Sequence, residues 1–478
     1  MTYPVLELLI DGRWIGLAHR TGEEVVNPAT DEVLGLLPYA DAADLDAALE
    51  AAQRGFVIWK RTTPVERAAI LRRAADLVRA RKEELATLVT LEQGKPLADA
   101  RGEVEATANV IEWSAEQGRR VYGRVIASRL PATRGMVVHE PVGPVAAFAP
   151  WNAPVMLSAR KIAEALAAGC SIIIKPAEEA PACVLALARA FVDAGVPNGV
   201  LNMVFGVPSR VSEHLIASPI IRKITFTGSV PVGRHLARLA ANGVKRISLE
   251  LGGHAPVLVF DDVDVDKVAE LAVVAKHRNA GQLCITPSRF YVHENIHDAF
   301  VTRVAELSGR LTVGNGLDAA TQMGPLTHPR RIAAMESLVA DARSVGATVR
   351  TGGESIGTRG HFFAPTVLTD VPPHAAIQTV EPFGPISPIM AFRSLDEVLD
   401  RANAVNVGLA SYIFSNTPRI ITAASSEIEA GLVAVNSFAV NAPETPFGGV
   451  KETGNGSEGG EEGLGAYLTT KFINETFV

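Results

Sequence analysis

The sequence predicts an α/β protein built on a parallel sheet, and three observations support this. Short apolar runs alternate with helical patterns from about residue 140 onward. These runs are apolar throughout instead of alternating in polarity, which is typical of parallel strands covered on both faces. The chain has 478 residues, 47% of them hydrophobic and 20% charged, which is enough for two or three domains with large cores.

The first well-signalled element is a helix that begins near residue 64. Thr63 can cap it, Pro64 suits the first helical position, and Glu66 completes a capping box. Apolar residues then recur at helical spacing, and Gly94 followed by Pro96 is a stop signal. We therefore expect one helix that runs from residue 64 to just before Gly94.

Five strands and four helices then alternate, which predicts a Rossmann-like domain. Such a sheet binds its ligands at the carboxyl ends of the strands. This domain would comprise residues 1–118 and 141–252. The strands are expected at 145–148, 171–175, 201–205, 223–227 and 246–251, and the helices near 156–168, 181–194, 208–217 and 231–241.

A second alternating region, with apolar runs at 256–260 and 290–293, predicts a separate α/β domain over residues 253–445. Residues 119–140 and 446–478 fit neither domain. We expect these two segments to form a small β arm that pairs with another subunit.

The composition excludes several classes of partner. The net charge of −7 argues against nucleic acid or an anionic membrane. Three scattered cysteines, without a CxxC pair or a Cys/His cluster, fit a reducing compartment and predict no metal site. We see no signal peptide and no apolar run of the roughly 20 residues that a membrane helix needs. These features predict a cytoplasmic protein.

Cys284 and Glu250 are the strongest candidates for chemistry. Cys284 follows a Gly-Gln pair, and Glu250 opens a Glu-Leu-Gly-Gly run 284 − 250 = 34 positions upstream. A thiol nucleophile and a carboxylate base in one pocket can form a thioester and then hydrolyse it. The alternative is that Cys284 is a small buried hydrophobe, as most free cysteines are. We interpret Cys170 and Cys183 in that structural way.

A candidate oxyanion donor follows the first strand of the sheet. Asn152 stands in the run Pro150-Trp151-Asn152-Ala153-Pro154. An asparagine held between prolines offers a rigid amide donor, as an oxyanion hole requires. An ordinary Asx turn is the alternative interpretation.

Glycines and a charged pair indicate a dinucleotide site. Gly228 and Ser229 follow a strand, and Gly233 lies five positions after Gly228, so a helix N-terminus could approach a pyrophosphate closely. The pattern is not GxGxxG after the first strand, so the dinucleotide must lie differently from the standard arrangement. Lys175 and Glu178 end the second strand, where a carboxylate can accept the adenosine-ribose hydroxyls and would favour NAD over NADP. The alternative for this pair is a solvated ion pair.

These segments together resemble the aldehyde dehydrogenase superfamily over nearly the whole chain. Each motif is short, but their order and spacing leave little room for chance. They are Asn27-Pro28-Ala29-Thr30, Pro150-Trp151-Asn152, Lys175-Pro176-Ala177-Glu178, Phe226-Thr227-Gly228-Ser229, Glu250-Leu251-Gly252-Gly253, Gly281-Gln282-Leu283-Cys284, Glu381-Pro382-Phe383-Gly384-Pro385 and Pro446-Phe447-Gly448-Gly449-Val450-Lys451.

The resemblance implies oxidation of an aldehyde to its acid with NAD, or NADP, by a homodimer or homotetramer. The first domain would bind the cofactor, and residues 253–445 would form the catalytic domain. Cys284 would be the nucleophile, Asn152 the oxyanion donor together with the Cys284 N–H, Glu250 the base and Lys161 a supporting residue. The implied cofactor-binding residues are Trp151, Lys175, Glu178, Gly228, Ser229, Gly233, Leu251, Glu381 and Phe383.

Two arginines suggest the substrate. Arg160 and Arg278 look like the arginines with which succinate-semialdehyde dehydrogenases bind a distant carboxylate, and guanidinium groups suit carboxylates. One of them could instead serve an interdomain salt bridge. The loop 440–444 lacks the serine that those enzymes place near the carboxylate, and Thr286 stands where some members carry a redox-switch cysteine.

Several alternatives therefore stay open. The aldehyde could be glutarate or ketoglutarate semialdehyde, or an uncharged or aromatic aldehyde. A CoA-acylating reaction is disfavoured because Glu250, the base for hydrolysis, is present. A catalytically silent structural protein is disfavoured because Cys284 and Asn152 are present as well. His254 and His277 flank the catalytic motifs and would suit a cysteine–histidine hydrolase, but a lone histidine is more often structural.

Overall fold

The first domain is built on an eight-stranded sheet with the strand order β2-β1-β9-β8-β7-β10-β11-β21. The structure is a computed structural model that describes residues 2–477. Five central strands are parallel, and antiparallel strands close both edges. The strands are β1 (Leu8–Ile10), β2 (Arg13–Ile15), β7 (Val145–Phe148), β8 (Ile172–Lys175), β9 (Leu201–Met203), β10 (Lys223–Thr227), β11 (Arg246–Glu250) and β21 (Gly454–Asn455).

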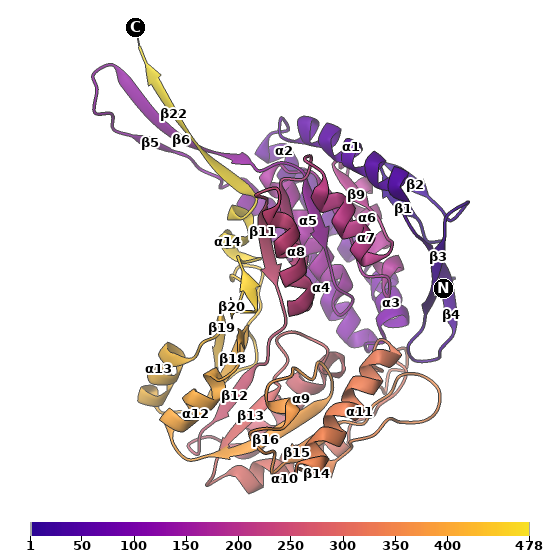
Figure 1. Cartoon of the computed structure of the whole chain (residues 1–478), viewed down its shortest axis with the longest axis vertical. Helices are drawn as coiled ribbons and strands as arrows, with labels where there is room; N and C mark the ends of the chain where they lie inside the picture. Colours follow the sequence, from indigo (N-terminus) through magenta and orange to yellow (C-terminus); the bar gives the residue numbers. More distant parts are fainter. Residues whose placement is uncertain (1, 478) are drawn as a thin grey trace.

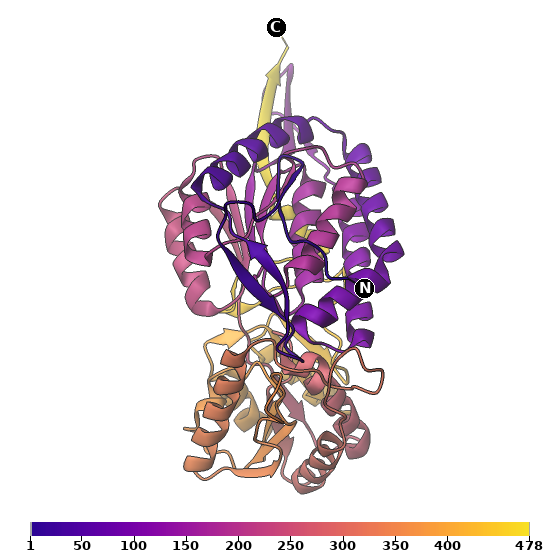
Figure 2. The same cartoon turned by 90° about the vertical axis from the view of Figure 1, so that its right-hand side faces the viewer.

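Helices cover both sides of this sheet (Figure 2). Every residue of β7, β8 and β10 is buried, as expected of apolar strands in a doubly covered parallel sheet. The five predicted strands and the four helices between them are confirmed. The helices are α1 (Ala42–Trp59), α2 (Pro64–Ala80), α3 (Lys82–Gln93), α4 (Leu97–Gly118), α5 (Pro154–Ala168), α6 (Pro181–Asp193), α7 (Pro208–Ala217) and α8 (Val230–Ala241).

The expected single helix after residue 64 is two helices in the structure. The capping box of Thr63 and Glu66 is present, and Gly94, with a φ of 91°, ends the second helix as predicted. The chain departs from helical geometry at Arg81, with φ −99° and ψ 20°, which separates α2 from α3. No proline or glycine marks this point, so the sequence carries no local signal for the break.

The second domain contains a seven-stranded sheet in the order β14-β15-β16-β13-β12-β18-β19, parallel except at β14. It lies below the first domain in Figure 1, and the chain enters it directly after β11. Its strands are β12 (Pro256–Val259), β13 (Arg289–His293), β14 (Thr348–Thr351), β15 (Thr366–Thr369), β16 (Ile386–Phe392), β18 (Ala410–Phe414) and β19 (Leu432–Val435). Its helices are α9 (Val265–His277), η1 (Arg278–Gly281), α10 (His297–Gly309), α11 (Pro329–Ser344), η2 (Ala376–Gln378), α12 (Leu395–Asn403) and α13 (Pro418–Glu427).

A narrow arm of three antiparallel strands projects from the first domain, away from the second (Figure 1). Its strands are β5 (Arg124–Ile126), β6 (Thr133–Pro141) and β22 (Leu468–Thr476), and β22 pairs with β6 along its whole length. Two separate two-stranded sheets complete the fold. They comprise β3 (Gly22–Val26) with β4 (Val33–Pro38), and β17 (Val407–Gly408) with β20 (Val450–Lys451).

The arm is smaller than the sequence analysis expected. Residues 446–467 lie outside its sheet, because β20 pairs with β17 and β21 pairs with β11 of the first domain. The short helix α14 (Gly460–Gly465) then packs beside α5. Buried Glu458, which contacts Lys161, holds this segment against the body of the protein. Among residues 2–477, no helix is both long and apolar enough to cross a bilayer.

Candidate active site

The first domain has a crevice where its strand order changes direction. The chain runs outward from β7 to β8 and β9, then returns to β10 on the other side of β7. The loops that leave β7 and β10 therefore diverge, which is where open α/β sheets bind ligands. Asn152 follows β7, and Gly228 with Ser229 follows β10. These residues line a cavity of about 450 Å³.

This first cavity lies between the two domains. Glu250 and Leu251 reach it from the end of β11, and Cys284, Glu381 and Phe383 reach it from the second domain. Six of the nine predicted cofactor residues line it: Trp151, Gly228, Ser229, Leu251, Glu381 and Phe383.

The other three predicted cofactor residues lie outside the lining. Lys175 and Glu178 form an ion pair at the end of β8, and Lys175 Nζ also donates to the Pro176 carbonyl at 3.0 Å. Gly233 is in the first turns of α8, where an added Cβ would lie 2.5 Å from Leu251 Cδ2. A larger residue at 233 would therefore displace the Leu251 side chain.

The residues present fit a dinucleotide. Ser229 is the N-cap of α8, but its side chain makes no cap hydrogen bond, so N–H groups of the first turn are free to face a phosphate. Burial raises the pKa of Glu381 to about 8, which Arg331 partly offsets. A carboxyl group held in this way inside the cavity can hydrogen-bond to a ribose hydroxyl.

An aromatic wall and two basic residues complete the first cavity. The Trp151 ring meets His328 and Phe383 edge-on, with centroids 5.4 and 5.6 Å apart. Arg331 donates to the Phe383 carbonyl at 3.2 Å, and its Nε has no protein partner among the described residues. His328, Arg330 and Arg331 also line the cavity, and none of the three was predicted from the sequence. His328 is the N-cap of α11 and the two arginines lie in its first turn, where the local sequence carries no recognisable binding motif.

Cys284 and Asn152 line a second cavity as well, of about 250 Å³. The thiol therefore stands where the two cavities meet. Arg160, Arg278 and Phe438 line the second cavity but not the first. A substrate in the second cavity and a dinucleotide in the first would approach the same sulfur from different sides.

The loop before Cys284 has an unusual backbone. Asn279, Ala280 and Gly281 are three consecutive residues with positive φ, at 50°, 52° and 75°. Only glycine adopts this region without cost, so the surrounding contacts must hold the first two. The Gln282 side chain does so, because Nε2 donates to the Asn279 carbonyl at 3.1 Å and Oε1 accepts from the Thr327 N–H at 3.0 Å.

The Asn152 side chain is tied to the same loop. Its Nδ2 donates to the Gln282 carbonyl at 3.0 Å, and the Asn152 carbonyl accepts from Asn279 Nδ2 at 2.9 Å. A side-chain amide carries two N–H bonds, so one remains for a substrate oxygen.

The titration of both reactive groups is shifted by burial. Burial raises the pKa of the Cys284 thiol to about 12, with further contributions from the Glu381 and Glu250 carboxylates. Glu250 is only 3% exposed, and neither of its side-chain oxygens has a partner within residues 2–477. Burial, followed by the nearby charge of Glu458, raises the pKa of Glu250 well above its usual value. A raised pKa makes the ionised Glu250 carboxylate a stronger base than an exposed carboxylate would be.

Lys161 lies behind the reacting groups and not among them. Its buried ammonium contacts the Glu458 carboxylate and donates to Thr227 Oγ1 at 2.8 Å and to Thr225 Oγ1 at 3.2 Å. Thr227 pairs with Glu250 in the parallel sheet. Lys161 thus supports the strand ends that carry Glu250.

The two predicted substrate arginines differ in environment. Arg160 is 1% exposed, its Nη2 donates to Asn441 Oδ1 at 3.0 Å, and its guanidinium lies 5.1 Å from the Phe447 ring centroid. Its Nε and Nη1 are buried without a partner in the described chain. Arg278 is exposed at the edge of the same cavity. The contact between Asn441 and Arg160 was not predicted from the sequence.

The residues that were interpreted as structural lie away from both cavities. The ring nitrogens of buried His254 contact Ser288 Oγ at 2.8 Å and the Ile377 carbonyl at 2.9 Å. Burial lowers the pKa of His277 to about 4. Cys170 and Cys183 are fully buried free thiols. Within residues 2–477, no cluster of three or more potential metal ligands occurs.

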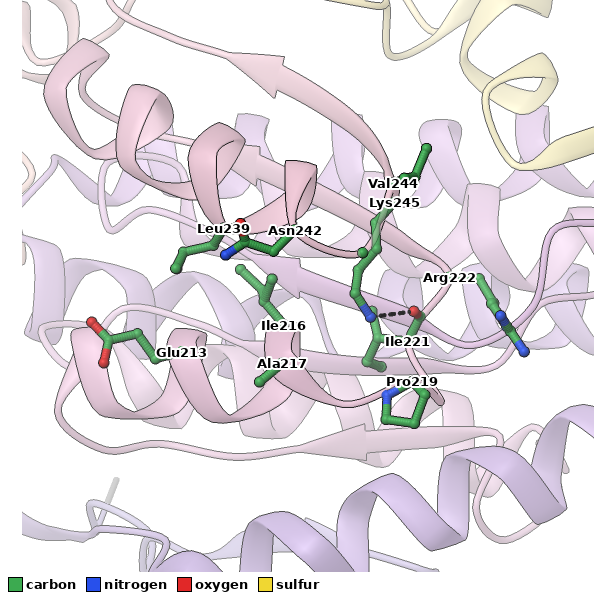
Figure 3. A pocket seen from close by; sticks show the side chains of 11 residues that line it. Glu213, Ile216, Ala217, Pro219, Ile221, Arg222, Leu239, Asn242, Val244 and Lys245 are labelled. Atoms are coloured by element: carbon green, nitrogen blue, oxygen red, sulfur yellow. Dashed lines mark hydrogen bonds between the residues drawn. The ribbon is translucent and has the colours of Figure 1, made fainter.

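A third cavity, of about 460 Å³, opens at the opposite ends of the same strands (Figure 3). It lies beside Ile221 and Arg222, which precede β10, whereas Thr227 of the active site ends β10. Lys245 points into it and donates to the Ile221 carbonyl at 2.8 Å. Neither Cys284 nor Glu250 lines this cavity, so it is separate from the reacting groups.

The chain is similar in sequence and in overall structure to known proteins. The model described as "Aldehyde dehydrogenase family" matches residues 14–473. The chain is 49% identical over 472 residues to 4-(hydroxymethyl)benzenesulfonate dehydrogenase TsaD1 of Comamonas testosteroni, covering 99% of this chain and 98% of that protein. It is 40% identical over 467 residues to the succinate-semialdehyde dehydrogenase [NADP(+)] GabD of Escherichia coli, covering 98% and 97%. The crystal structure of succinate-semialdehyde dehydrogenase from Burkholderia pseudomallei superposes with a TM-score of 0.97 at 42% identity, covering 99% and 98%.

Proposed function

The chain belongs to the aldehyde dehydrogenase family, and from that premise we propose that Cys284 and Glu250 convert an anionic aldehyde to its acid in two stages. The family's reaction is NAD(P)-dependent oxidation of an aldehyde. The observation that carries the proposal is the position of Cys284, which lines both the cavity suited to a dinucleotide and the cavity that contains Arg160.

In the first stage the Cys284 thiolate adds to the aldehyde carbon from the second cavity, giving a tetrahedral thiohemiacetal. The free N–H of Asn152 and the Cys284 backbone N–H stabilise its oxyanion, as donors aimed at developing charge do. Collapse of the oxyanion to a thioester requires a hydride acceptor beside Cys284. A bound NAD(P)+ would supply that acceptor in its nicotinamide ring.

The residues of the first cavity would hold that cofactor. Trp151 and Phe383 wall the space beside Cys284, and Glu381 can bind the nicotinamide ribose. The start of α8, at Gly228 and Ser229, can face the pyrophosphate. The remaining proposed contacts are Lys175 and Glu178 for the adenosine ribose, with Gly233 and Leu251 shaping the approach of α8.

In the second stage Glu250 removes a proton from water, which attacks the thioester and releases the acid. Neither Glu250 oxygen has a protein partner among residues 2–477, so no side-chain hydrogen bond has to break before the carboxylate accepts a proton. An added Cβ on Gly448 would lie 3.4 Å from Glu250 Oε1, so a glycine at this position leaves room beside the carboxylate. Lys161 supports this site through Thr227.

The substrate is proposed to carry an anion at the end distant from its aldehyde. Arg160 is a buried cation that lines the substrate cavity, and two of its nitrogens have no partner among residues 2–477. Such a group calls for an anionic partner. Arg278 can contribute at the edge. The names of both relatives above contain an acid group, a sulfonate in one and a carboxylate in the other. Succinate semialdehyde is therefore one candidate.

An aromatic anionic aldehyde is the second candidate. Phe438 and Phe447 line the substrate cavity, and the more similar of the two relatives is named for a benzenesulfonate. Flat aromatic walls suit a ring between the aldehyde and its anion.

A panel of aldehydes tests the proposal. Succinate semialdehyde, 4-sulfobenzaldehyde, 4-carboxybenzaldehyde and benzaldehyde would each be assayed with NAD+ and NADP+, in the presence and absence of CoA. We expect the anionic aldehydes to have the higher kcat/KM and CoA to have no effect. Equal kcat/KM for benzaldehyde and its charged counterparts would contradict the anion site.

We also propose that the arm mediates assembly as a homodimer or homotetramer. Its strands expose large apolar side chains, with Val125 72% and Phe472 59% exposed, and Phe477, directly after β22, is 59% exposed. Exposed apolar surface of this kind is typical of protein contacts. Light scattering on the full chain and on a variant with charged residues at Val125 and Phe472 would measure the change in assembly.

A further inference from the structure

We propose that Lys95 and Glu103 form a clamp that positions the Asn152 amide for the oxyanion. This inference rests on the proposed oxyanion role of Asn152 and extends it to two residues that neither the motifs nor the comparisons identify. Lys95 follows α3 directly after Gly94, and Glu103 lies on α4. Both side chains are buried beside the loop that carries Asn152.

The clamp holds the loop at two points. Lys95 Nζ donates to the Asn152 carbonyl at 2.9 Å and to Glu103 Oε2 at 2.6 Å. Glu103 Oε1 accepts from the N–H groups of Val155 at 3.0 Å and Met156 at 3.2 Å. Lys95 therefore fixes the backbone of Asn152 at its own carbonyl, and Glu103 fixes the start of α5 that follows it.

The helix α5 depends on Glu103 at its beginning. Its N-cap is Ala153, which has no side chain that can accept a hydrogen bond. Glu103 supplies the missing acceptor from another helix, and its negative charge also suits a helix N-terminus. The first turn of α5 is thereby anchored to α4 instead of to its own cap.

A network of buried amides joins the clamp to the nucleophile. The Lys95 N–H donates to Gln93 Oε1 at 3.1 Å, and Gln93 Nε2 donates to Thr327 Oγ1 at 3.1 Å. The Thr327 N–H donates to Gln282 Oε1 at 3.0 Å, and the Gln282 carbonyl accepts from Asn152 Nδ2. These contacts lead back to Asn152. One set of hydrogen bonds therefore holds both the Asn152 amide and residues 279–283, which we call the nucleophile loop because they precede Cys284.

The energetics favour a positioning role over a stabilising one. A buried ion pair is often no more stable than apolar residues of the same size, because both charges lose their hydration. An oxyanion donor, by contrast, loses much of its effect when it is displaced by about 1 Å. Lys95 also lines the substrate cavity, so direct contact with the substrate is the competing explanation.

Two reactions of the same thiol separate these explanations. Acylation of Cys284 by 4-nitrophenyl acetate passes through an oxyanion and needs no dinucleotide, whereas alkylation by iodoacetamide forms no oxyanion. We expect Lys95→Met to slow acylation by about 100-fold, the scale of a displaced catalytic group, while alkylation is unchanged. Equal slowing of both reactions, or of neither, would overturn the clamp.

A double variant that lacks the charges of both Lys95 and Glu103 is the control for misfolding. Lys95→Met leaves the Glu103 carboxylate buried and unpaired, so Lys95→Met/Glu103→Gln is made beside it; the glutamine retains an acceptor for α5. Thermal unfolding reports whether each variant is folded. The double variant is expected to lose acylation as Lys95→Met does, and normal acylation in a folded double variant would refute the proposal.

A cycle with Asn152→Ala identifies the residue through which Lys95 acts. If the clamp works through Asn152, Lys95→Met adds no further loss of acylation in the Asn152→Ala background. Multiplicative losses would mean direct action of Lys95 on the substrate. If Asn152→Ala leaves acylation unchanged, Asn152 is not the oxyanion donor, and the clamp proposal fails with it. If Asn152→Ala slows acylation but Lys95→Met leaves it unchanged, only the clamp proposal fails.

Discussion

Asn441 fixes Arg160 inside the substrate cavity, with Oδ1 of the amide 3.0 Å from Nη2 of the guanidinium. The contact leaves Nε and Nη1 of Arg160 buried and without a partner among residues 2–477. Asn441 thus orients the arginine without neutralising it. The positive charge stays available for a substrate that brings its own anion.

Replacing Arg160 should therefore act on anionic aldehydes only. For Arg160→Met we expect kcat/KM for succinate semialdehyde to fall by the equivalent of about 2–4 kcal/mol, because the substrate anion is left buried and unpaired. The value for benzaldehyde should hardly change. Arg278→Met is the matched control, and a smaller loss is expected because Arg278 is exposed. Equal losses for charged and uncharged aldehydes would contradict the assignment.

Removal of the thiol should separate binding from chemistry. In Cys284→Ala we expect no oxidation of any aldehyde, while NAD+ binding measured by calorimetry persists, since Trp151, Ser229 and Glu381 still line the cavity. Cys183→Ala, which removes a buried thiol outside both cavities, is the control. Undiminished turnover in Cys284→Ala would refute covalent catalysis.

The two stages should separate in Glu250→Gln. An amide cannot accept a proton from water, so hydrolysis of the thioester should become limiting. Rapid mixing is expected to show a burst of NADH near one equivalent per site, followed by slow turnover. If the burst disappears along with turnover, Glu250 acts before hydride transfer.

The pH dependence of Cys284 follows from its burial. Since the pKa of the thiol is raised to about 12, the neutral thiol predominates at neutral pH and the thiolate fraction grows as the pH rises. In the free enzyme, alkylation by iodoacetamide should accelerate about tenfold per pH unit from about pH 7 to about pH 9. A plateau within that range would show that a nearby group lowers the thiol pKa.

Much of this site was predictable because its residues follow strands or stand in short motifs. Asn152 and Gly228 follow β7 and β10, and Glu250 ends β11, so a parallel sheet alone places them at one edge. Arg331 and Asn441 carry no such signal. They reach the cavities only through the packing of α11 and of the loop after β19 against the first domain.

Local geometry was likewise predictable only where a residue type demands it. Gly94 signalled the end of α3, because the left-handed region suits glycine. The break at Arg81 and the positive φ of Ala280 had no such marker. Neither conformation is marked by the type of residue that adopts it.

The nucleophile loop offers a test of close packing separate from backbone strain. Gly281 and Gly357 have the same φ of 75°, so alanine at either position must adopt a positive φ, at a cost of about 1–2 kcal/mol. An added Cβ at Gly281 would lie 2.3 Å from the Gly384 carbonyl oxygen, whereas nothing lies within 4 Å at Gly357. The carbonyl belongs to the backbone and can yield only if the loop moves.

We therefore expect Gly281→Ala to lower the unfolding temperature more than Gly357→Ala and to slow acylation of Cys284, which lies three residues further along the chain. Gly357→Ala should retain full activity, because its surroundings are open. Thermal unfolding and the NADH burst, measured on both variants, distinguish the two effects. Equal unfolding temperatures and equal bursts would show that the contact between Gly281 and Gly384 does not hold the nucleophile in place.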